Sequence, residues 1–305
     1  MAGSELNVVT GASGFTGRYI ARRLLSVKQR VLNLTGHPER RAETGDQIPS
    51  VPFNFDKPDE LADSLRGATT LCNTYWIRFP YGALTFDDAV RNSITLIKAA
   101  KDAGIRRFVH ISVTNPSLDS PLPYFRGKAV VEQAIIESGL SFAVLRPAVI
   151  FGDEGILINN IAWLLRRFPV FAIPGDGSYQ LQPIFVEDLA ELAVNTASGD
   201  DDIIMDAVGP ETYSFNSLLR LVARTVRSRT RLMHLNPPLT FLLSKLLGHI
   251  LGDRMLTRDE VKGLMANLLV SEQPPTGDTR LSDWLAESAD WIGTGYMSEL
   301  KKHYR

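Results

Sequence analysis

Three glycines stand three residues apart between the first strand-like run and the first helical run of this 305-residue chain. The segment reads Val-Val-Thr-Gly-Ala-Ser-Gly-Phe-Thr-Gly over residues 8–17. In a strand–turn–helix, Gly11 permits the tight turn, Gly14 lets the backbone approach a pyrophosphate, and Gly17 allows the helix to pack closely. Amides at the helix start attract the anion. The segment therefore predicts a dinucleotide-binding loop, and the alternative is a small-residue turn without a ligand.

Short β-branched runs and amphipathic helical runs alternate over the first 150 residues. Strands are expected at 6–10, 30–35, 69–74, 107–113 and 142–150, and helices at 14–26, 58–66, 86–103 and 124–138. Such alternation implies parallel strands joined by right-handed crossover helices. The predicted fold class is α/β, with a doubly wound parallel sheet of the Rossmann type.

The alternation of strands and helices becomes less regular after Gly152. A strand entering a helix is expected over 182–196, a further strand at 203–207, and helices at 159–167, 215–227, 239–251, 257–269 and 281–292. We therefore predict two parts. Residues 1–152, to which 180–208 return, form the NAD(P)-binding Rossmann domain, and residues 153–179 and 209–305 form a smaller, mostly helical substrate-side lobe.

Composition narrows the function classes. Thirty-three Lys and Arg nearly balance 34 Asp and Glu, and the net charge of -1 gives no field that would attract nucleic acid. Cys72 is the single cysteine, so no internal disulfide and no cysteine-based metal site are expected. The N-terminus lacks signal-peptide features, and the longest apolar stretch, 239–251, is too short to span a bilayer. A cytoplasmic protein without bound metal is predicted.

The glycine spacing and several later segments resemble the extended and atypical short-chain dehydrogenase/reductases. These segments are Asp56 after Phe-Asn-Phe, and residues 72–74, 92–96, 106–112, 145–152 and 185–190. The resemblance covers most of residues 6–225. Beyond that it is looser, and is nearest to NmrA-like members and to those related to an accessory subunit of respiratory complex I.

The resemblance implies a set of residues that bind NAD(P). They are Gly11, Ala12, Ser13, Gly14, Phe15, Thr16, Gly17, Arg18, His37, Arg40, Asp56, Asn73, Thr74, Tyr75, Lys128, Pro147 and Val149. The second strand ends without a carboxylate at its tip, where NAD-preferring sites usually carry one. His37, Arg40 and Arg41 would suit a 2′-phosphate, with Arg18 assisting, so NADP is favoured over NAD. The alternative is that Arg40 and Arg41 belong to a solvated loop.

Tyr124 and Lys128 match the family's Tyr-x-x-x-Lys pair and share one helix face. A nearby ammonium favours the phenolate that carbonyl and alcohol interconversion needs. Val113, however, stands where the family's third hydroxyl normally lies, with Ser112 and Thr114 on either side. The preferred hypothesis is an oxidoreductase or epimerase-like enzyme. The alternative is a non-catalytic NAD(P)-binding sensor or accessory subunit.

Two further segments bear on ligands and partners. Trp76 and Arg78 lie in an aromatic loop after the strand at 69–74, which would suit a flat or apolar small-molecule substrate, or which only packs. The helix expected at 239–251 is apolar on most of its surface and must be covered. Packing within the smaller lobe is preferred over a homodimer contact, a lid, or contact with a membrane interface.

Overall fold

The computed structural model describes residues 4–39 and 48–303, which form two compact units. The first unit runs to Pro147 and also contains Val186–Asp206. The second contains Ala148–Phe185 and continues from Ala207. Each unit is built around its own cluster of buried apolar side chains.

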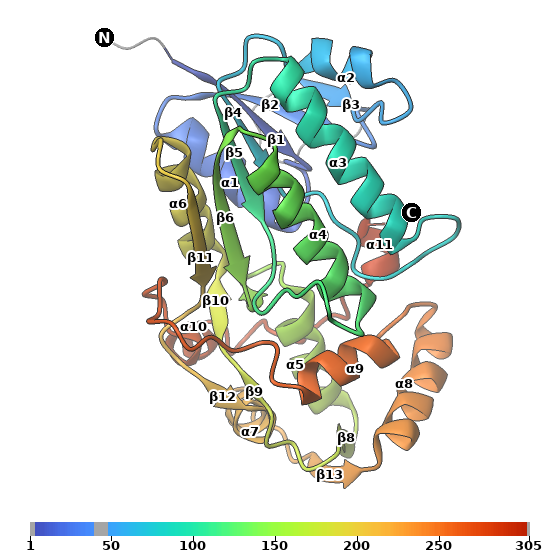
Figure 1. Cartoon of the computed structure of the whole chain (residues 1–305). Helices are drawn as coiled ribbons and strands as arrows, with labels where there is room; N and C mark the ends of the chain where they lie inside the picture. Colours follow the sequence, from blue (N-terminus) through green and yellow to red (C-terminus); the bar gives the residue numbers. More distant parts are fainter. Residues whose placement is uncertain (1–3, 40–47, 304–305) are drawn as a thin grey trace. The chain divides into compact units, whose positions relative to one another are not determined.

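The first unit contains a seven-stranded sheet with the order β11-β6-β5-β4-β1-β2-β3 (Figure 1). The neighbouring pairs from β6 to β3 are parallel. The strands are β1 (Leu6–Thr10), β2 (Arg30–Thr35), β3 (Ser50–Pro52), β4 (Thr70–Asn73), β5 (Arg107–Ile111), β6 (Ser141–Pro147) and β11 (Ile203–Ala207). The predicted doubly wound parallel sheet is confirmed.

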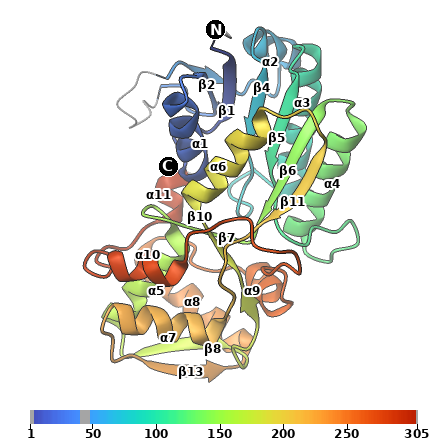
Figure 2. The same cartoon turned by 90° about the vertical axis from the view of Figure 1, so that its left-hand side faces the viewer.

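Helices cover both faces of this sheet (Figures 1 and 2). On one face, α1 (Phe15–Ser26) packs against α6 (Val186–Ala197). On the other face, α3 (Phe86–Asp102) packs against both α2 (Pro58–Leu65) and α4 (Pro123–Glu137). Strands enclosed on both sides bury almost every residue, as in β4 and β5.

The second unit combines helices with three two-stranded sheets. Its strands are β7 (Val149–Phe151), β8 (Val170–Pro174), β9 (Gln180–Leu181), β10 (Pro183–Phe185), β12 (Tyr213–Ser214) and β13 (Arg231–Leu235). Its helices are α5 (Ile156–Arg167), α7 (Phe215–Thr225), α8 (Pro237–Leu251), α9 (Arg258–Met265), α10 (Leu281–Glu287) and α11 (Glu299–His303). The parallel pair of β8 and β13 was not predicted.

Two properties of the described residues bear on function. Among residues 4–39 and 48–303, no helix has the length and apolar character needed to cross a membrane. Cys72 is buried with a free thiol, and burial raises the pKa of this thiol to about 12. A thiol with a raised pKa is a poor nucleophile, so the side chain of Cys72 serves as a small apolar group in the core.

Candidate nucleotide-binding site

The glycine loop joins β1 to α1 through a turn that depends on left-handed backbone. Gly11 has a φ of +65°, a region that side-chain-bearing residues rarely adopt. Its amide donates to the carbonyl of Leu34 at 2.8 Å, and the amide of Gly14 donates to the carbonyl of Gly11 at 2.8 Å. Gly14 then caps α1, which begins at Phe15. The loop is thus folded back on its own backbone beside β2.

Gly17 lies in the first turn of α1, directly against this loop. A Cβ at Gly17 would stand 2.2 Å from the carbonyl oxygen of Gly11 and 3.0 Å from that of Thr10. Both neighbours are backbone atoms that cannot move without opening the turn. The first turn also contains Thr16, half-buried, and Arg18, and carries no acidic side chain that would repel an anion at the helix start.

Arg18 supports the loop from within the structure. Its side chain is buried, and its Nη2 donates to the carbonyl of Ser13 at 3.0 Å. A guanidinium bound to a loop carbonyl restrains the conformation of that loop and adds positive charge beneath it.

Asn33 of β2 is a loop-supporting residue that the sequence analysis missed. Its buried Oδ1 accepts from the amide of Ala12 at 2.8 Å, and its Nδ2 donates to the hydroxyl of Ser50 at 2.9 Å. The amide of Ala12 is therefore satisfied by a side chain 21 residues away. A polar residue at a buried, strand-interior position is the signal that could have revealed it.

We predict that Asn33→Ala loosens the glycine loop. The amide of Ala12 loses its acceptor in a buried position, which costs about 1–3 kcal/mol of unfolding free energy. Ser50→Ala is the matched control, because it removes the other partner of Asn33 and leaves the bond to Ala12. Urea unfolding should show a lower unfolding free energy, and NADPH titration a weaker affinity, in Asn33→Ala only. Equal effects of the two substitutions would contradict this role.

A buried polar ladder joins the carboxyl ends of β1, β4 and β5. The amide of Thr74 donates to the hydroxyl of Thr10 at 2.6 Å, and the hydroxyl of Thr74 donates to the carbonyl of Thr10 at 2.5 Å. Asn73 Oδ1 accepts from the hydroxyl of Thr10 at 3.2 Å and from the amide of Tyr75 at 3.0 Å. These bonds fix the chain where it leaves β4, at the sheet edge where ligands bind in parallel sheets.

His110 ends this ladder on β5. Its Nδ1 lies 3.1 Å from Nδ2 of Asn73, whose amide group donates, so the ring proton is assigned to Nε2. Burial, followed by the charge of Lys128, lowers the pKa of His110 well below its usual value, so the ring is neutral. Within the described part of the chain Nε2 has no hydrogen-bond partner. His110 is therefore a fully buried residue with one of its two ring nitrogens hydrogen-bonded.

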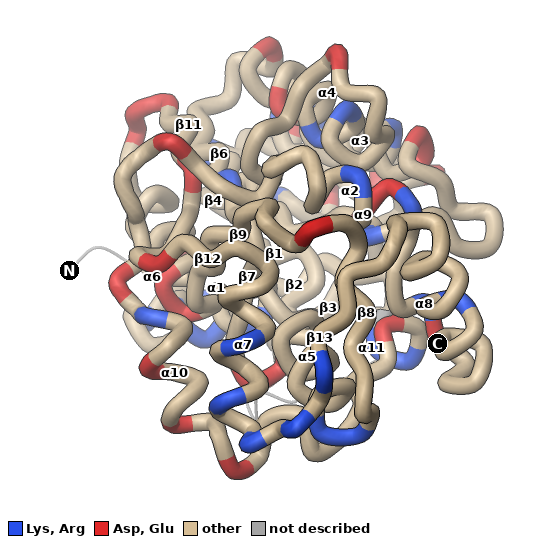
Figure 3. Tube along the Cα trace, turned by 90° about the horizontal axis from the view of Figure 1, so that it is seen from below, with Lys and Arg blue, Asp and Glu red and all other residues tan. Residues whose placement is uncertain are grey.

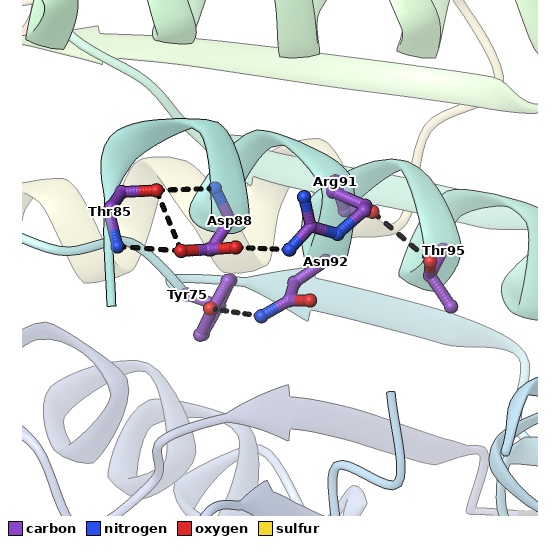
Figure 4. A network of polar contacts seen from close by, with 6 residues as sticks. All are labelled: Tyr75, Thr85, Asp88, Arg91, Asn92 and Thr95. Carbon is purple, nitrogen blue, oxygen red and sulfur yellow. Dashed lines mark hydrogen bonds and ion pairs between the residues drawn. The ribbon is translucent and has the colours of Figure 1, made fainter. Parts of the chain in front are cut away.

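Tyr75 is anchored to the first turns of α3 (Figure 4). Asn92 donates from Nδ2 to the Tyr75 hydroxyl at 2.9 Å. The same helix begins with a capping box in which the Thr85 hydroxyl accepts from the amide of Asp88 at 3.2 Å, and the Asp88 carboxylate accepts from the amide of Thr85 at 2.8 Å. Arg91 pairs with the same carboxylate. The loop after β4 is therefore held to a well-formed helix start.

Aromatic rings gather just after the end of β3. Phe53 and Phe55 stack at 4.8 Å between centroids, and each lies 5.1 Å from the Tyr75 ring. Asp56 is exposed directly after them. The ring group packs against the buried core and gives this edge of the sheet a flat apolar lining.

The residues predicted to contact a 2′-phosphate are only partly described. His37 is exposed, and its Nδ1 lies 4.0 Å from a carboxylate oxygen of Glu39. Arg40 and Arg41 lie outside the described residues. Glu39, which follows the end of β2 by four residues, brings a carboxylate next to His37. A carboxylate there disfavours a phosphate and so opposes a preference for NADP.

Lys128 is deeply buried and capped by an indole ring. Its ammonium donates to the carbonyl of Ile111 at 2.7 Å and lies 4.7 Å from the centroid of Trp76. Burial lowers the pKa of Lys128 to about 7, and the opposing attraction of Glu132 is smaller. The lysine is therefore poised between its charged and neutral forms at neutral pH.

Trp76 packs between α3 and α4 as part of the core. A Cβ at Gly127 would stand 2.9 Å from the indole, so only glycine fits beneath the ring. The ring lies 6.0 Å from that of Tyr124 and 6.3 Å from that of Phe86. Tyr124 itself is half-buried, and its ring makes edge-to-face contacts with the rings of Phe86 and Phe125. Packing accounts for the environment of Trp76, although it was predicted on the substrate side.

Ser112 is engaged in a buried ion-pair network on the α4 side of the sheet. Its hydroxyl donates to Glu132, and the carboxylate of Glu132 also accepts from Arg146 Nη2 at 2.5 Å and Nε at 3.1 Å. Glu132 is almost fully buried. The hydroxyl proton of Ser112 is thus directed at a buried carboxylate and away from any second acceptor.

The remaining predicted site residues are dispersed. Thr114 is buried, and its amide donates to the carbonyl of Pro147 at 3.0 Å, at the end of β6. The guanidinium of Arg78 lies over the ring of Phe79 at 5.6 Å. Val149 belongs to β7 of the second unit, whereas the other predicted cofactor residues in the described chain belong to the first.

Comparison with known proteins is consistent with this arrangement. Residues 11–159 match a family described as NAD(P)H-binding. The resemblance to the atypical short-chain dehydrogenases is confirmed. The chain therefore contains an NAD(P)-binding domain, and the glycine loop, the aromatic edge and all of the strand-end ladder except Thr10 lie within the matched residues.

One curated relative is similar along most of the chain. It is the mitochondrial NADH dehydrogenase (ubiquinone) 1 alpha subcomplex subunit 9 of Arabidopsis thaliana, which is 25% identical over 287 residues, 87% of this chain and 70% of the relative.

Two solved structures share the fold. A nucleoside-diphosphate-sugar epimerase of Staphylococcus aureus has a TM-score of 0.75 at 14% identity, covering 92% of this chain and 99% of its own. The NADPH-dependent quinone oxidoreductase of Escherichia coli, in complex with NADPH, has a TM-score of 0.72 at 19% identity. The match covers 93% of this chain and 98% of the oxidoreductase chain.

Proposed function

We propose that this protein binds NAD(P) as a structural cofactor and acts as an accessory or assembly component rather than as a turnover enzyme. The engagement of Ser112 by Glu132 carries the proposal. Carbonyl reduction in this family type needs a hydroxyl beside the tyrosine, and here that position is Val113, while the neighbouring serine is bound to a buried carboxylate.

The environment of Lys128 supports the same proposal. Its ammonium is bound to a backbone carbonyl and covered by Trp76, so it must leave both to reach a ribose. The curated relative described above is named as a subunit of a larger complex, which agrees with a non-catalytic role for a chain of this type. The bound nucleotide would then stabilise the first unit by mass action.

Calorimetric titration with NADPH and NADH, followed by a hydride-transfer assay over a broad carbonyl panel, tests the proposal. We expect binding and no turnover. At a nucleotide concentration of about one hundred times Kd, the unfolding free energy should rise by roughly 2.7 kcal/mol. Turnover with any carbonyl would contradict the structural role, and the absence of binding would contradict the cofactor itself.

An oxidoreductase or epimerase-like enzyme is the second candidate, favoured by the low pKa of Lys128 on the same helix face as Tyr124. Tyr124 would donate and accept the proton, and Lys128 would tune it. Tyr124→Phe separates the two functions. Loss of turnover with retained binding favours the enzyme, whereas under the structural role the substitution leaves nucleotide binding unchanged.

For the cofactor we propose NADP(H) over NAD(H), on the guanidinium of Arg18 and the exposed imidazole of His37. The proximity of Glu39 to His37 limits the expected preference to a modest one. Titration of the same preparation with both reduced nucleotides measures it as a ratio of dissociation constants. Tighter binding of NADH would assign Glu39 to the ribose hydroxyls instead.

The proposed role requires a protein partner. The name of the curated relative places that protein in mitochondria and within a complex. The cytoplasmic location and the homodimer predicted from the sequence stay predictions for this chain. Tandem purification of the tagged protein from its own cells, with and without mild detergent, would identify such a partner.

A further inference from the structure

Helix α8 exposes five large aliphatic side chains on one face. Leu239, Leu242, Leu243, Leu246 and Ile250 recur at the spacing of a single helix face, and their side chains are 46%, 52%, 43%, 56% and 79% exposed. We call these five residues the outer stripe. In Figure 1 the helix lies at the edge of the second unit. The preferred sequence hypothesis, in which packing within the lobe covers this helix, is wrong for this face.

The inner side of α8 contains both small and large apolar residues. Thr240 and Gly248 are buried, and Ser244 is half-buried, as are Phe241, Leu247 and Leu251. The hydroxyl of Ser244 donates to the carbonyl of Phe241 within the helix at 2.8 Å. A surface helix normally buries one apolar face and exposes a polar one. This helix is apolar on both sides, so its outer stripe is placed for contact with an apolar phase outside the protein.

Basic residues accompany the outer stripe. Residues 227–258 contain six Lys and Arg and one acid, Asp253, in a chain whose total charge is -1. Asp253 is turned inward, where its carboxylate accepts from the Tyr296 hydroxyl at 2.7 Å and from the amides of Glu299 and Leu300. Lys245 is exposed on α8, and Arg258 lies over Phe241 at 5.1 Å. Figure 3 shows further basic positions near α7 and β13.

We propose that α8 lies in the interface of an anionic lipid bilayer, with the outer stripe in the acyl region and Lys245 near the headgroups. Leucines flanked by cations suit such a surface. A second copy of this chain fits less well, because two like-charged segments would face one another. Fifteen residues span about 22 Å, which is short of a bilayer core of about 30 Å, so the helix lies on the membrane rather than across it.

Vesicle co-sedimentation of the purified full chain tests the proposal. We expect it to bind phosphatidylcholine vesicles containing phosphatidylglycerol, and to bind pure phosphatidylcholine vesicles much less. Leu242→Ser/Leu246→Ser should weaken binding by at least about tenfold, since each buried CH₂ contributes about 0.8 kcal/mol. Val27→Ser/Leu118→Ser, which alters two residues exposed by 50% and 53% in the first unit, is the matched control and should bind normally.

Charge-reversal variants and a change of salt concentration test the electrostatic part of the proposal. Lys245→Glu should reduce binding to the anionic vesicles, and Lys98→Glu on α3 should not. Raising the salt concentration should release the wild-type protein, because screening weakens its attraction to the headgroups.

Several results would overturn the proposal. Wild-type protein that stays in the supernatant with both vesicle types would do so, as would a stripe variant that binds as well as the wild type. A dimer that becomes a monomer in the stripe variant, with no vesicle binding, would assign the stripe to a second copy. A stripe variant that loses a tight protein partner while vesicle binding is unchanged would assign it to that protein.

Discussion

Gly17→Ala is expected to unfold the nucleotide-binding loop and to abolish NADPH binding. The new Cβ would stand 2.2 Å from the carbonyl oxygen of Gly11 and 2.7 Å from its carbon, well inside van der Waals contact. Both atoms belong to a turn that Gly11 closes with a φ of +65°. Overpacking against rigid backbone should lower the unfolding free energy by about 3 kcal/mol or more. Urea unfolding and NADPH titration measure the two effects.

Gly199→Ala is the matched control in the same unit. Its Cβ would lie 3.9 Å from the carbonyl oxygen of Thr196, which is ordinary contact. This variant should keep wild-type stability within experimental error and bind NADPH normally. If Gly17→Ala behaves like Gly199→Ala, the close packing of α1 on the loop is not what shapes the site.

Lys128→Met is expected to make the protein more stable at neutral pH. The lysine is 2% exposed, and burial lowers its pKa from 10.5 to about 7. Between pH 7 and pH 10.5 the unfolded chain therefore binds a proton that the folded chain does not, so wild-type stability rises with pH across this window. One pKa unit corresponds to about 1.4 kcal/mol, so methionine should add a few kcal/mol near pH 7.

The measurement is urea unfolding of both proteins from pH 7 to pH 10. The stability difference between Lys128→Met and wild type should shrink as the pH rises and the folded and unfolded lysine reach the same charge state. Lys98→Met, at an exposed position on α3, should leave the wild-type pH profile unchanged. Parallel curves for wild type and Lys128→Met would show that Lys128 keeps an ordinary pKa.

The strand–helix alternation predicted the first unit well because its signals are local. The runs at 30–35 and 203–207 coincide with β2 and β11, and the glycine loop joins β1 to α1 as expected. The strand expected at 142–150 is two strands, β6 and β7, which belong to different sheets. Continuous apolar sequence does not reveal where a chain changes sheets. The pairing of β8 with β13 escaped prediction because it joins distant short segments.

The site was harder to predict than the fold, because its supports lie far apart in the sequence. The motif identified Gly11, Gly14 and Gly17, but no pattern linked Asn33 to Ala12, or Glu132 to both Ser112 and Arg146. Tyr124 and Lys128 were recognised by spacing alone. The ring of Trp76 over Lys128 depends on the tertiary path of the loop after β4, which spacing does not contain.

The polar ladder at the strand ends has a consequence for how the protein is made. Thr10 and Thr74 are 64 residues apart, and Asn73 bonds across a further 37 residues to His110. During synthesis, the glycine loop therefore emerges long before the strands that hold its far side. A nascent chain shorter than about 110 residues lacks β5 and has no completed edge for a nucleotide. Cofactor capture can occur only after this delay, so cellular nucleotide would stabilise finished domains and not early intermediates.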